Sequence, residues 1–357
     1  MKKGKVSIII ANYNYAIFLR AAIDSALGQT WTDKEIIVVD DGSIDNSCDV
    51  IKSFGDKIHS VFVQNGGQRR ANNIGFSLSI GEVIIFLDAD DILLPDFVDT
   101  VMSEWNENVS KIQVIAQRVD KNGVIFGNSL PKINNKISSK NIKYFNTKYL
   151  EYPSPPGSAN AYSSVFIKKI FPLGEDCDYS TDSTCIAMAP YFGDVINIKK
   201  SLVLYRMHDM NDSSMERADN VYSREVGRAI KRFSAIQRAC TMSCENGPDY
   251  LALFRGSHLL QLRIASMRLT PELHPLPNDN LVRAFLNAIQ LPFRNNSEDF
   301  PFRIMITVWS ILAIIAPDHL VGMLIKKRFC SISLVHGRYG VRKFLKSYFI
   351  KQRPIVT

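Results

Sequence analysis

Short apolar runs alternate with helical periodicity along the first ninety residues. Four compact runs rich in β-branched residues have the length and composition of buried strands, and they cover residues 6–10, 35–39, 58–63 and 83–87. Between these runs, apolar side chains recur every three or four positions, as on one face of a helix, near Leu19, near Val50 and over residues 71–79. This order predicts an α/β fold, in which helices cover both faces of a mostly parallel sheet.

Polar clusters follow three of the four expected strands, at residues 12–14, 40–43 and 88–91. In parallel α/β sheets, ligands bind beyond the carboxyl ends of the strands, so we expect the three clusters to line one site. A local structural role is also open, because Asp90 or Asp91 could cap a helix over residues 93–101. Asp91 could do both jobs, and capping is the role we expect first.

The later parts of the chain have weaker patterns. Residues 131–160 are rich in Asn, Ser, Lys and Pro, which predicts a loop-rich connection, and residues 221–291 have helical periodicity. The apolar run 304–316 is followed by a second apolar stretch at residues 320–325. A membrane-spanning helix needs about 20 apolar residues, so the segment 303–328 is expected either to associate with a membrane surface or to form a buried core helix. The sequence leaves both open.

The net charge of +8 is concentrated at the C-terminus, where residues 319–357 contain nine Lys or Arg and no Asp or Glu. Such a segment favours an anionic membrane surface by about 1 kcal/mol per basic residue. The rest of the chain is close to neutral, so we expect no nucleic-acid partner. With 46% hydrophobic and 22% charged residues, the composition is that of a globular protein.

Cysteine usage and the N-terminus favour a cytoplasmic location. The six cysteines form no CxxC pair, and the apolar run after Met1 is too short for a signal peptide. Attachment of the segment 303–328 would place the protein at the inner face of the plasma membrane.

Two carboxylates two positions apart predict a metal site. Asp88 and Asp90 follow the fourth strand, and their oxygens suit a hard cation such as Mg²⁺ or Mn²⁺, which also binds diphosphate. Such a cation neutralises negative charge on a leaving nucleoside diphosphate. No G-x-G-x-x-G follows the first strand, which argues against a dinucleotide oxidoreductase.

Taken together, these motifs resemble the family 2 glycosyltransferases. The resemblance is dense over residues 5–100 and continues more sparsely to about residue 214. Its parts are residues 6–14, Gln29-Thr30, residues 37–43, Gly66-Gly67-Gln68 and residues 81–91. It implies the GT-A fold, a Rossmann-like and mostly parallel sheet flanked by helices, with a mainly helical C-terminal region. It also implies sugar transfer from a nucleotide donor with inversion at the anomeric carbon.

The resemblance gives the donor side its residues. It places Asp90 on the metal, Asp88 near the ribose and the metal, and Asp41 on a ring N–H of the pyrimidine, with Asp40 supporting the turn. Further donor-side positions are Ala11 and Tyr13, which would wrap the base, and Gly67, which would allow close backbone approach.

It also implies an acceptor side and a closing motif. Asp182 matches the family's general base, which must take a proton from the acceptor hydroxyl. In Tyr205-Arg206-Met207-His208, Arg206 would steady the diphosphate and His208 would complete the metal shell. Ser158 and Asn160 are candidate acceptor contacts.

One step departs from the family pattern. Where relatives carry Ala-Arg-Asn, this chain has Ala71-Asn72-Asn73. Arg69 or Arg70 would then replace the missing arginine or lie on a solvated face, and the sequence leaves both open.

The sequence as a whole predicts an inverting, metal-dependent glycosyltransferase of bacterial surface-polysaccharide assembly. Its donor would be a UDP- or dTDP-sugar, and its acceptor a saccharide or a lipid-linked molecule. The expected domains are a GT-A domain over residues 1–220, with a donor half (1–100) and an acceptor half (101–220), and a helical region over residues 221–357. The alternative is a catalytically degenerate module that only binds a nucleotide sugar.

Overall fold

The computed structural model describes residues 4–131, 140–208, 211, 220–294 and 298–334. The chain forms two compact units, each described here by itself. Unit 1 comprises Met1–His208 and Lys231–Ala252, and unit 2 comprises Asp209–Ile230 and Leu253–Thr357. The domain boundary expected at residue 220 stays a prediction.

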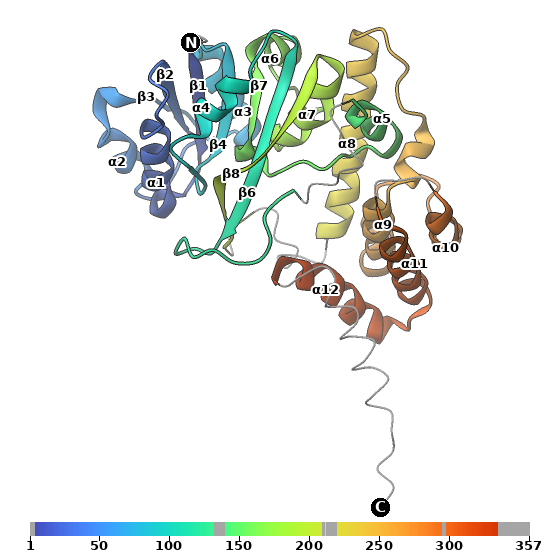
Figure 1. Cartoon of the computed structure of the whole chain (residues 1–357). Helices are drawn as coiled ribbons and strands as arrows, with labels where there is room; N and C mark the ends of the chain where they lie inside the picture. The colour runs from blue at the N-terminus through green and yellow to red at the C-terminus, as the bar shows by residue number, and fades with distance from the viewer. Residues whose placement is uncertain (1–3, 132–139, 209–210, 212–219, 295–297, 335–357) are drawn as a thin grey trace, which may run out of the picture. The chain divides into compact units, whose positions relative to one another are not determined.

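Unit 1 is built on one eight-stranded mixed sheet within the described residues, in the order β3-β2-β1-β4-β7-β6-β8-β5 (Figure 1). The strands are β1 Val6–Asn12, β2 Lys34–Asp40, β3 His59–Phe62, β4 Val83–Asp88, β5 Ile92–Leu93, β6 Val109–Val119, β7 Asn160–Ser163 and β8 Asp194–Arg206. The first four strands are parallel to one another, as the sequence predicts. β7 pairs antiparallel with both β4 and β6, which makes the sheet mixed.

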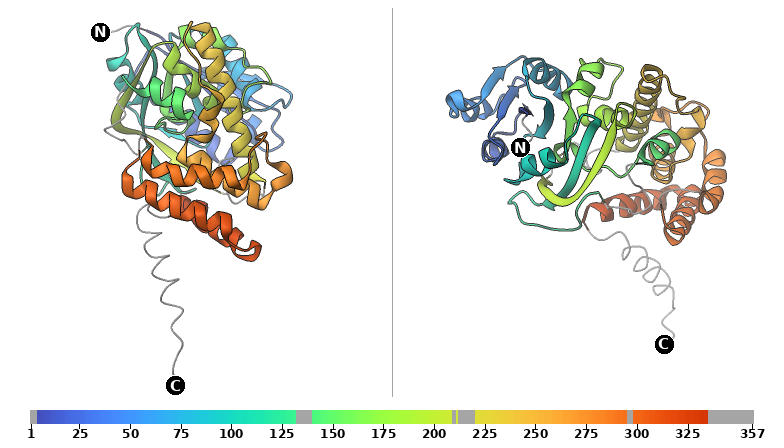
Figure 2. Two further views of the ribbon diagram at one scale, coloured as in Figure 1. Left: turned by 90° about the vertical axis from the view of Figure 1, so that its right-hand side faces the viewer. Right: turned by 45° about the horizontal axis from the view of Figure 1, so that its top comes forward.

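Helices cover both faces of this sheet, as Figures 1 and 2 show. Ile8 and Ile10 of β1 share a core cluster with Leu19 of α1 (Ala16–Leu27). Successive side chains of a strand point to opposite faces, and Ile9 lies against Gly75 of α3 (Gln68–Leu78), where an added Cβ would be 2.4 Å from its Cγ2 atom. Since β1 is buried on both faces, its uninterrupted apolar run is what its position requires.

The remaining helices of unit 1 include three, α5, α6 and α7, that the sequence did not indicate. They are α2 Ser47–Lys52, α4 Phe97–Glu104, α5 Ile142–Tyr149, α6 Ser164–Ile170 and α7 Thr181–Met188, and α8 (Val221–Met242) runs from unit 2 into unit 1. The segment 131–160, expected to be loop-rich, thus contains the helix α5. Its buried positions, which include the polar Asn146, give only a weak apolar pattern.

The helix expected over residues 93–101 begins later, at Phe97, after the two-residue strand β5. Asp91 directly precedes β5 and lies five positions before Asp96, the N-cap residue of that helix. Its side chain is fully buried in unit 1. The expected capping role of Asp91 is therefore wrong, because its carboxylate binds partners inside the fold.

Unit 2 is helical in its described part, as expected for the C-terminal region. Its helices are α9 Ser257–Leu269, α10 Leu281–Gln290, α11 Phe300–Ile315 and α12 Asp318–Leu334, and α9 packs against the other three. The segment 303–328 falls within α11 and α12. Among the described helices, none combines the length and the apolar character needed to cross a membrane.

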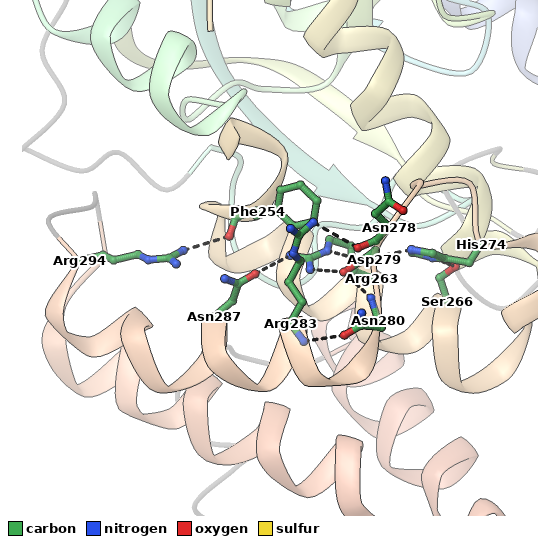
Figure 3. Close-up of polar contacts among 10 residues, drawn as sticks. All are labelled: Phe254, Arg263, Ser266, His274, Asn278, Asp279, Asn280, Arg283, Asn287 and Arg294. Carbon is green, nitrogen blue, oxygen red and sulfur yellow. Dashed lines mark hydrogen bonds and ion pairs between the residues drawn. The ribbon is translucent and has the colours of Figure 1, made fainter. Parts of the chain in front are cut away.

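A buried ion pair lies at the centre of unit 2 (Figure 3). Arg263 of α9 donates two hydrogen bonds to the Asp279 carboxylate, at 2.7 and 2.6 Å, and a third to Asn287 at 3.2 Å. Its guanidinium also lies 4.4 Å from the ring centre of Phe254. These contacts satisfy a charge that has no access to water.

Candidate functional site

The ends of β1 and β2 are tied together by one carboxylate. Asp40 accepts hydrogen bonds from the Asn12 amide at 2.8 Å, the Ser43 backbone N–H at 3.0 Å and the Ser43 hydroxyl at 2.6 Å. The predicted role of Asp40 as a support of this turn is confirmed. Asn14 joins the same group, because its backbone N–H donates to the Ser43 hydroxyl at 2.9 Å.

Asp41 fixes the loop that leads into α3. Its two carboxylate oxygens accept the backbone N–H groups of Gly66, at 2.9 Å, and Gly67, at 2.7 Å. Gly67 has φ +87° and ψ 159°, a conformation essentially restricted to glycine. A carboxylate oxygen has two lone pairs, so Asp41 keeps acceptor capacity for a ligand N–H.

Beside Asp41, the end of β1 presents the two positions expected to wrap a base. Ala11 is half-buried, and the Tyr13 side chain is 44% exposed. Tyr13 is therefore partly open to solvent near the end of β1, and an aromatic side chain there suits stacking on a ligand.

Three carboxylates crowd the end of β4. Asp88 accepts a hydrogen bond from the Gln68 amide at 3.0 Å, and burial, with the charges of Asp90 and Asp182 nearby, raises the pKa of Asp88 to about 8. Burial and the neighbouring charges of Asp90 and Asp88 likewise raise the pKa of Asp91 well above its ordinary value. Such displaced pKa values are typical of functional sites.

Ser158 links this acidic turn to the loop before β7. Its hydroxyl donates to Asp91 at 2.6 Å and accepts the Asp88 backbone N–H at 3.1 Å. Asn160 is equally buried and donates to the backbone carbonyls of Pro156 and Gly157. Both residues therefore shape the loop, and their expected contacts with an acceptor stay predictions.

Asp90 and His208 are in direct contact. The Asp90 Oδ2 and His208 Nε2 atoms lie 2.9 Å apart, and the imidazole stacks on Phe18 at 4.6 Å between ring centres. Arg206 donates to the Asp90 backbone carbonyl at 2.8 Å and to the Lys121 carbonyl at 2.8 Å. Arg206 thus positions the Asp90 turn, and its expected contact with a diphosphate stays a prediction.

The donor set fits a divalent cation that shares its shell with a substrate. Across the described residues, no cluster of three or more His, Cys, Asp or Glu is arranged to hold a metal by itself. Asp90 and His208 offer one carboxylate and one imidazole. Mg²⁺ is usually bound through one or two carboxylates together with substrate phosphates and water, so two protein ligands are sufficient for such a site.

Asp182 lies next to the same glycine as Asp88. It is in the first turn of α7 and accepts hydrogen bonds from the Ser183 backbone N–H at 2.8 Å and from the Ser180 hydroxyl. A Cβ atom added to Gly157 would lie 3.3 Å from the Asp182 Cβ and 3.4 Å from the Asp88 Oδ2. The structure therefore brings the candidate base and the acidic end of β4 next to the same backbone position.

The residues at the departure from the family pattern tie α3 to the neighbourhood of Asp182. Asn72 donates to the Thr181 hydroxyl at 2.9 Å, and Asn73 exchanges two hydrogen bonds with the backbone of Leu173. Arg69 and Arg70 donate to the backbone carbonyls of Cys177 and Gln64. Each of these arginines thus has a structural contact. That Arg69 or Arg70 replaces the arginine of the family pattern stays a prediction.

Sequence reasoning missed Lys111 of β6. Its side chain is fully buried and donates to the Tyr152 hydroxyl at 3.1 Å. Burial lowers the pKa of Lys111 well below its ordinary value, although the negative charge of Asp182 acts in the opposite direction. The local sequence contains no signal for this burial, because Lys111 stands between Ser110 and Ile112 in a strand that also carries Gln113 and Gln117.

Unit 2 contains a second arrangement that merits a functional test. Ser266, His274 and Asp279 form a chain, with 2.8 Å from the Ser266 hydroxyl to His274 Nδ1 and 3.1 Å from His274 Nε2 to Asp279. A nucleophile must reach its substrate, but Ser266 is fully buried and Asp279 already binds Arg263. The chain is therefore a structural network (Figure 3).

The fold and this site define the class of protein. Acidic and glycine-rich turns gather at the carboxyl ends of parallel strands, where α/β proteins bind nucleotides and related phosphates. Residues 7–171 match the family model described as Glycosyl transferase family 2. The chain is also 34% identical over 222 residues to an uncharacterized glycosyltransferase of Nostoc sp., an alignment that covers 58% of this chain and 66% of that protein. The chain belongs to the family 2 glycosyltransferases.

Other similar proteins match between about a third of the chain and nearly all of it. An uncharacterized glycosyltransferase of Rickettsia typhi is 41% identical over 110 residues, which cover 31% of this chain and 35% of that protein. The chain thus spans 66% of the first relative and about a third of the second. The crystal structure of S. aureus TarS 1-349 in complex with UDP-GlcNAc matches with a TM-score of 0.50 and 16% identity, over 99% of this chain and 94% of that one. This likeness confirms the expected GT-A fold.

Proposed function

We propose that this protein transfers a sugar from a nucleoside-diphosphate donor to a hydroxyl of a saccharide or lipid-linked acceptor. The observation that carries the proposal is that Asp88 and Asp182 both approach the same side of Gly157, where an added Cβ would lie within 3.5 Å of each. A glycosyl transfer of this kind needs acidic residues where the donor binds and a proton acceptor for the attacking hydroxyl, both within reach of one reacting centre. These two carboxylates, which are 94 positions apart in the chain, meet that requirement.

The donor is a UDP- or dTDP-sugar, and its base is held at the ends of β1 and β2. Asp41 accepts a pyrimidine ring N–H with the lone pairs that its contacts to Gly66 and Gly67 leave open. Tyr13 stacks on the base and Ala11 gives it room. Gly67 allows the backbone to approach the ligand closely.

Asp90 and His208 are the residues that would hold Mg²⁺ or Mn²⁺, with Asp88 close to both the ion and the ribose. When bound, the ion supplies positive charge to the diphosphate that leaves. The raised pKa of Asp88, caused by burial and by Asp90 and Asp182, supports a cationic ligand here. Arg206 keeps the Asp90 turn in place.

Asp182 takes the proton from the acceptor hydroxyl as that oxygen attacks the anomeric carbon. One direct displacement inverts the configuration at that carbon, because the attack comes from the side opposite the leaving diphosphate. The hydrogen bonds from Ser183 and Ser180 orient the Asp182 carboxylate. Assembly of a bacterial surface polysaccharide is the biological setting we propose, by analogy with enzymes of this kind.

A donor screen tests this function. Nucleoside diphosphate release would be measured with UDP- and dTDP-sugars, saccharide acceptors, and Mg²⁺ or Mn²⁺ either present or chelated. UDP-GlcNAc is the first donor to test, because it is the one named in the TarS complex. Asp182→Asn should lower turnover by about 10²–10⁴-fold, the usual contribution of a general base, and leave donor binding intact.

Asp176→Asn is the matched control, because Asp176 is an exposed carboxylate six positions away in sequence. It should keep turnover within about twofold of wild type. Wild-type turnover in Asp182→Asn would remove Asp182 from its role. Donor binding without release of nucleoside diphosphate from any donor would instead support the degenerate binding module.

A further inference from the structure

Every exposed residue of α11 is apolar. The fully described helix Phe300–Ile315 presents Phe300, Pro301, Ile304, Val308, Leu312 and Ile315 to solvent. Five of them are large and are 36–65% exposed. From Phe300 onward those five are spaced four, four, four and three positions apart, which places them along one side of a helix. We call these five residues the apolar row.

The opposite side of α11 is committed to the core of unit 2. Ile306, Trp309 and Ala313 are buried there, and α11 packs against α9 and α10. The row is therefore the surplus apolar face of a helix that has already buried one face. Single exposed apolar side chains are ordinary on protein surfaces, but a continuous row of them indicates a contact with something else.

Three side chains hold α11 in this orientation. Thr307 donates to the Ala288 carbonyl of α10 at 3.0 Å. Arg303 donates to the Pro292 carbonyl at 2.7 Å. Arg268 of α9 donates to the carbonyls of Ile314, in the last turn of the helix, and of the C-cap residue Ala316, at 3.0 and 2.6 Å. Because the helix is fixed at its start, middle and end, the row stays directed away from the core.

A second set of apolar side chains is exposed on the preceding segment. Val282, Leu286 and Ile289 of α10 lie at spacings of four and three, and Phe293 follows after another four positions at 85% exposure. Unit 2 thus displays two apolar helix faces that its own core does not use.

The charge that follows the row indicates what binds there. Lys326 and Lys327 are exposed on α12, and residues 319–357 contain nine Lys or Arg with no Asp or Glu. An apolar helix face followed along the chain by a cluster of basic residues is the combination that binds anionic lipid surfaces. A second copy of this chain would bring the same positive segment and would be repelled by it.

The dimensions of α11 fit a helix that lies on a lipid surface. Its sixteen residues correspond to about 24 Å of helix, whereas a spanning helix needs about 20 residues. One face is packed on protein, so only the row is available to hydrocarbon. We infer that the apolar row of α11 docks unit 2 on an anionic lipid bilayer. This inference goes beyond the proposed sugar transfer and does not rest on it.

Vesicle sedimentation tests the inference with the full chain. Phosphatidylcholine vesicles would be compared with vesicles that also contain phosphatidylglycerol, at low and high salt. Wild type should bind the anionic vesicles, less strongly at high salt. The double variant Ile304→Glu/Val308→Glu should bind them at least about tenfold more weakly, because it puts charge into the row.

The matched control is Val124→Glu/Val165→Glu, which changes two exposed apolar residues of unit 1 that lie outside the row. It should bind like wild type, and equal melting temperatures of both variants would confirm that each remains folded. Equal binding of wild type and the row variant, or no binding of wild type to either vesicle, would overturn the inference. So would a wild-type dimer that the row variant converts to a monomer without a change in lipid binding, because the row would then be a contact between copies.

Discussion

At the scale of single residues, unit 1 contains buried ionisable groups whose surroundings disfavour the charged form. Burial and nearby acids raise the pKa values of Asp88 and Asp91, and burial lowers that of Lys111. A fold selected for stability alone would replace such groups with apolar ones. Their presence around Asp182 supports a site in which charge is used on a substrate.

Lys111 gives a prediction about stability and pH. An unfolded chain keeps this lysine charged up to about pH 10.5, whereas the folded chain releases the proton at lower pH because the side chain is buried. Lys111 therefore lowers the free energy of unfolding least at high pH, and this destabilisation grows as the pH falls. Lys111→Met should stabilise the protein at pH 7 by about 1–3 kcal/mol, and by less at pH 9.5.

Urea unfolding at both pH values measures this difference. Lys57→Met is the control, since Lys57 is exposed and its replacement should change the unfolding free energy little at either pH. A Lys111→Met variant that is less stable than wild type at pH 7 would contradict the prediction. That outcome would mean that the hydrogen bond to Tyr152 and the attraction to Asp182 outweigh burial.

At the scale of helices and strands, local sequence predicted the parts that are buried on both faces. The four parallel strands were found to within about two residues at each end. For β1, β2 and β4 the reason is that strands buried on both faces consist of uninterrupted apolar runs, whereas β3 is a largely exposed edge strand. The turn held by Asp40 was equally predictable, since its partner Ser43 is three residues away.

Other elements depend on partners that are distant in sequence. The strand β8 carries the exposed run Lys199, Lys200 and Ser201 in its middle, so it has no apolar pattern from end to end. Its pairing with β6 joins residues more than eighty positions apart. Lys111 could not be recognised as buried for the same reason, because its burial depends on the elements that surround β6.

The short 3-10 helix η2 (Gly157–Ala159) offers a test of the site geometry. Gly157→Ala would place a methyl group 3.3 Å from the Asp182 Cβ and 3.4 Å from the Asp88 Oδ2. One or both carboxylates must then shift by a few tenths of an ångström. Because transfer rates depend steeply on the placement of reacting groups, we expect turnover to fall by about tenfold or more, with a smaller change in donor affinity.

Steady-state kinetics and donor binding by calorimetry measure the two effects separately. Gly322→Ala serves as the control, because an added Cβ at this position of α12 meets open space. It should leave kcat unchanged and should not lower the melting temperature. Unchanged turnover in Gly157→Ala would show that Asp88 and Asp182 do not act together on one substrate.

At the scale of the whole molecule, the two units contain different kinds of chemistry. All the residues proposed to act on a nucleotide sugar belong to unit 1, and the apolar row belongs to unit 2. Unit 2 also contains its own source of stability, the Arg263–Asp279 pair (Figure 3). Changes to that pair should therefore affect unit 2 without altering the proposed chemistry directly.

Loss of one partner of this pair should destabilise unit 2 strongly. Arg263→Met leaves the fully buried Asp279 carboxylate with fewer donors, and breaking a buried pair in this way costs about 3–5 kcal/mol. The double variant Arg263→Met/Asp279→Leu removes both charges and should recover part of that loss. Hydrogen exchange should show lost protection in α9 and α10 of the single variant, with little change in β1 to β4.

The pH dependence of the same pair follows from Asp279. Burial tends to raise its pKa, but hydrogen bonds from Arg263 and His274 outweigh burial, and the pKa of Asp279 is lowered. The folded state therefore holds this proton less tightly than the unfolded chain does. The stability that the pair contributes is present above about pH 4, the ordinary pKa of Asp, and is lost as the pH falls through the lower pKa of Asp279 in the folded state.

The gap in stability between wild type and Arg263→Met should thus narrow below pH 4. A gap that stays constant into that range, or exchange that increases equally in both units, would mean that the pair does not hold unit 2 together.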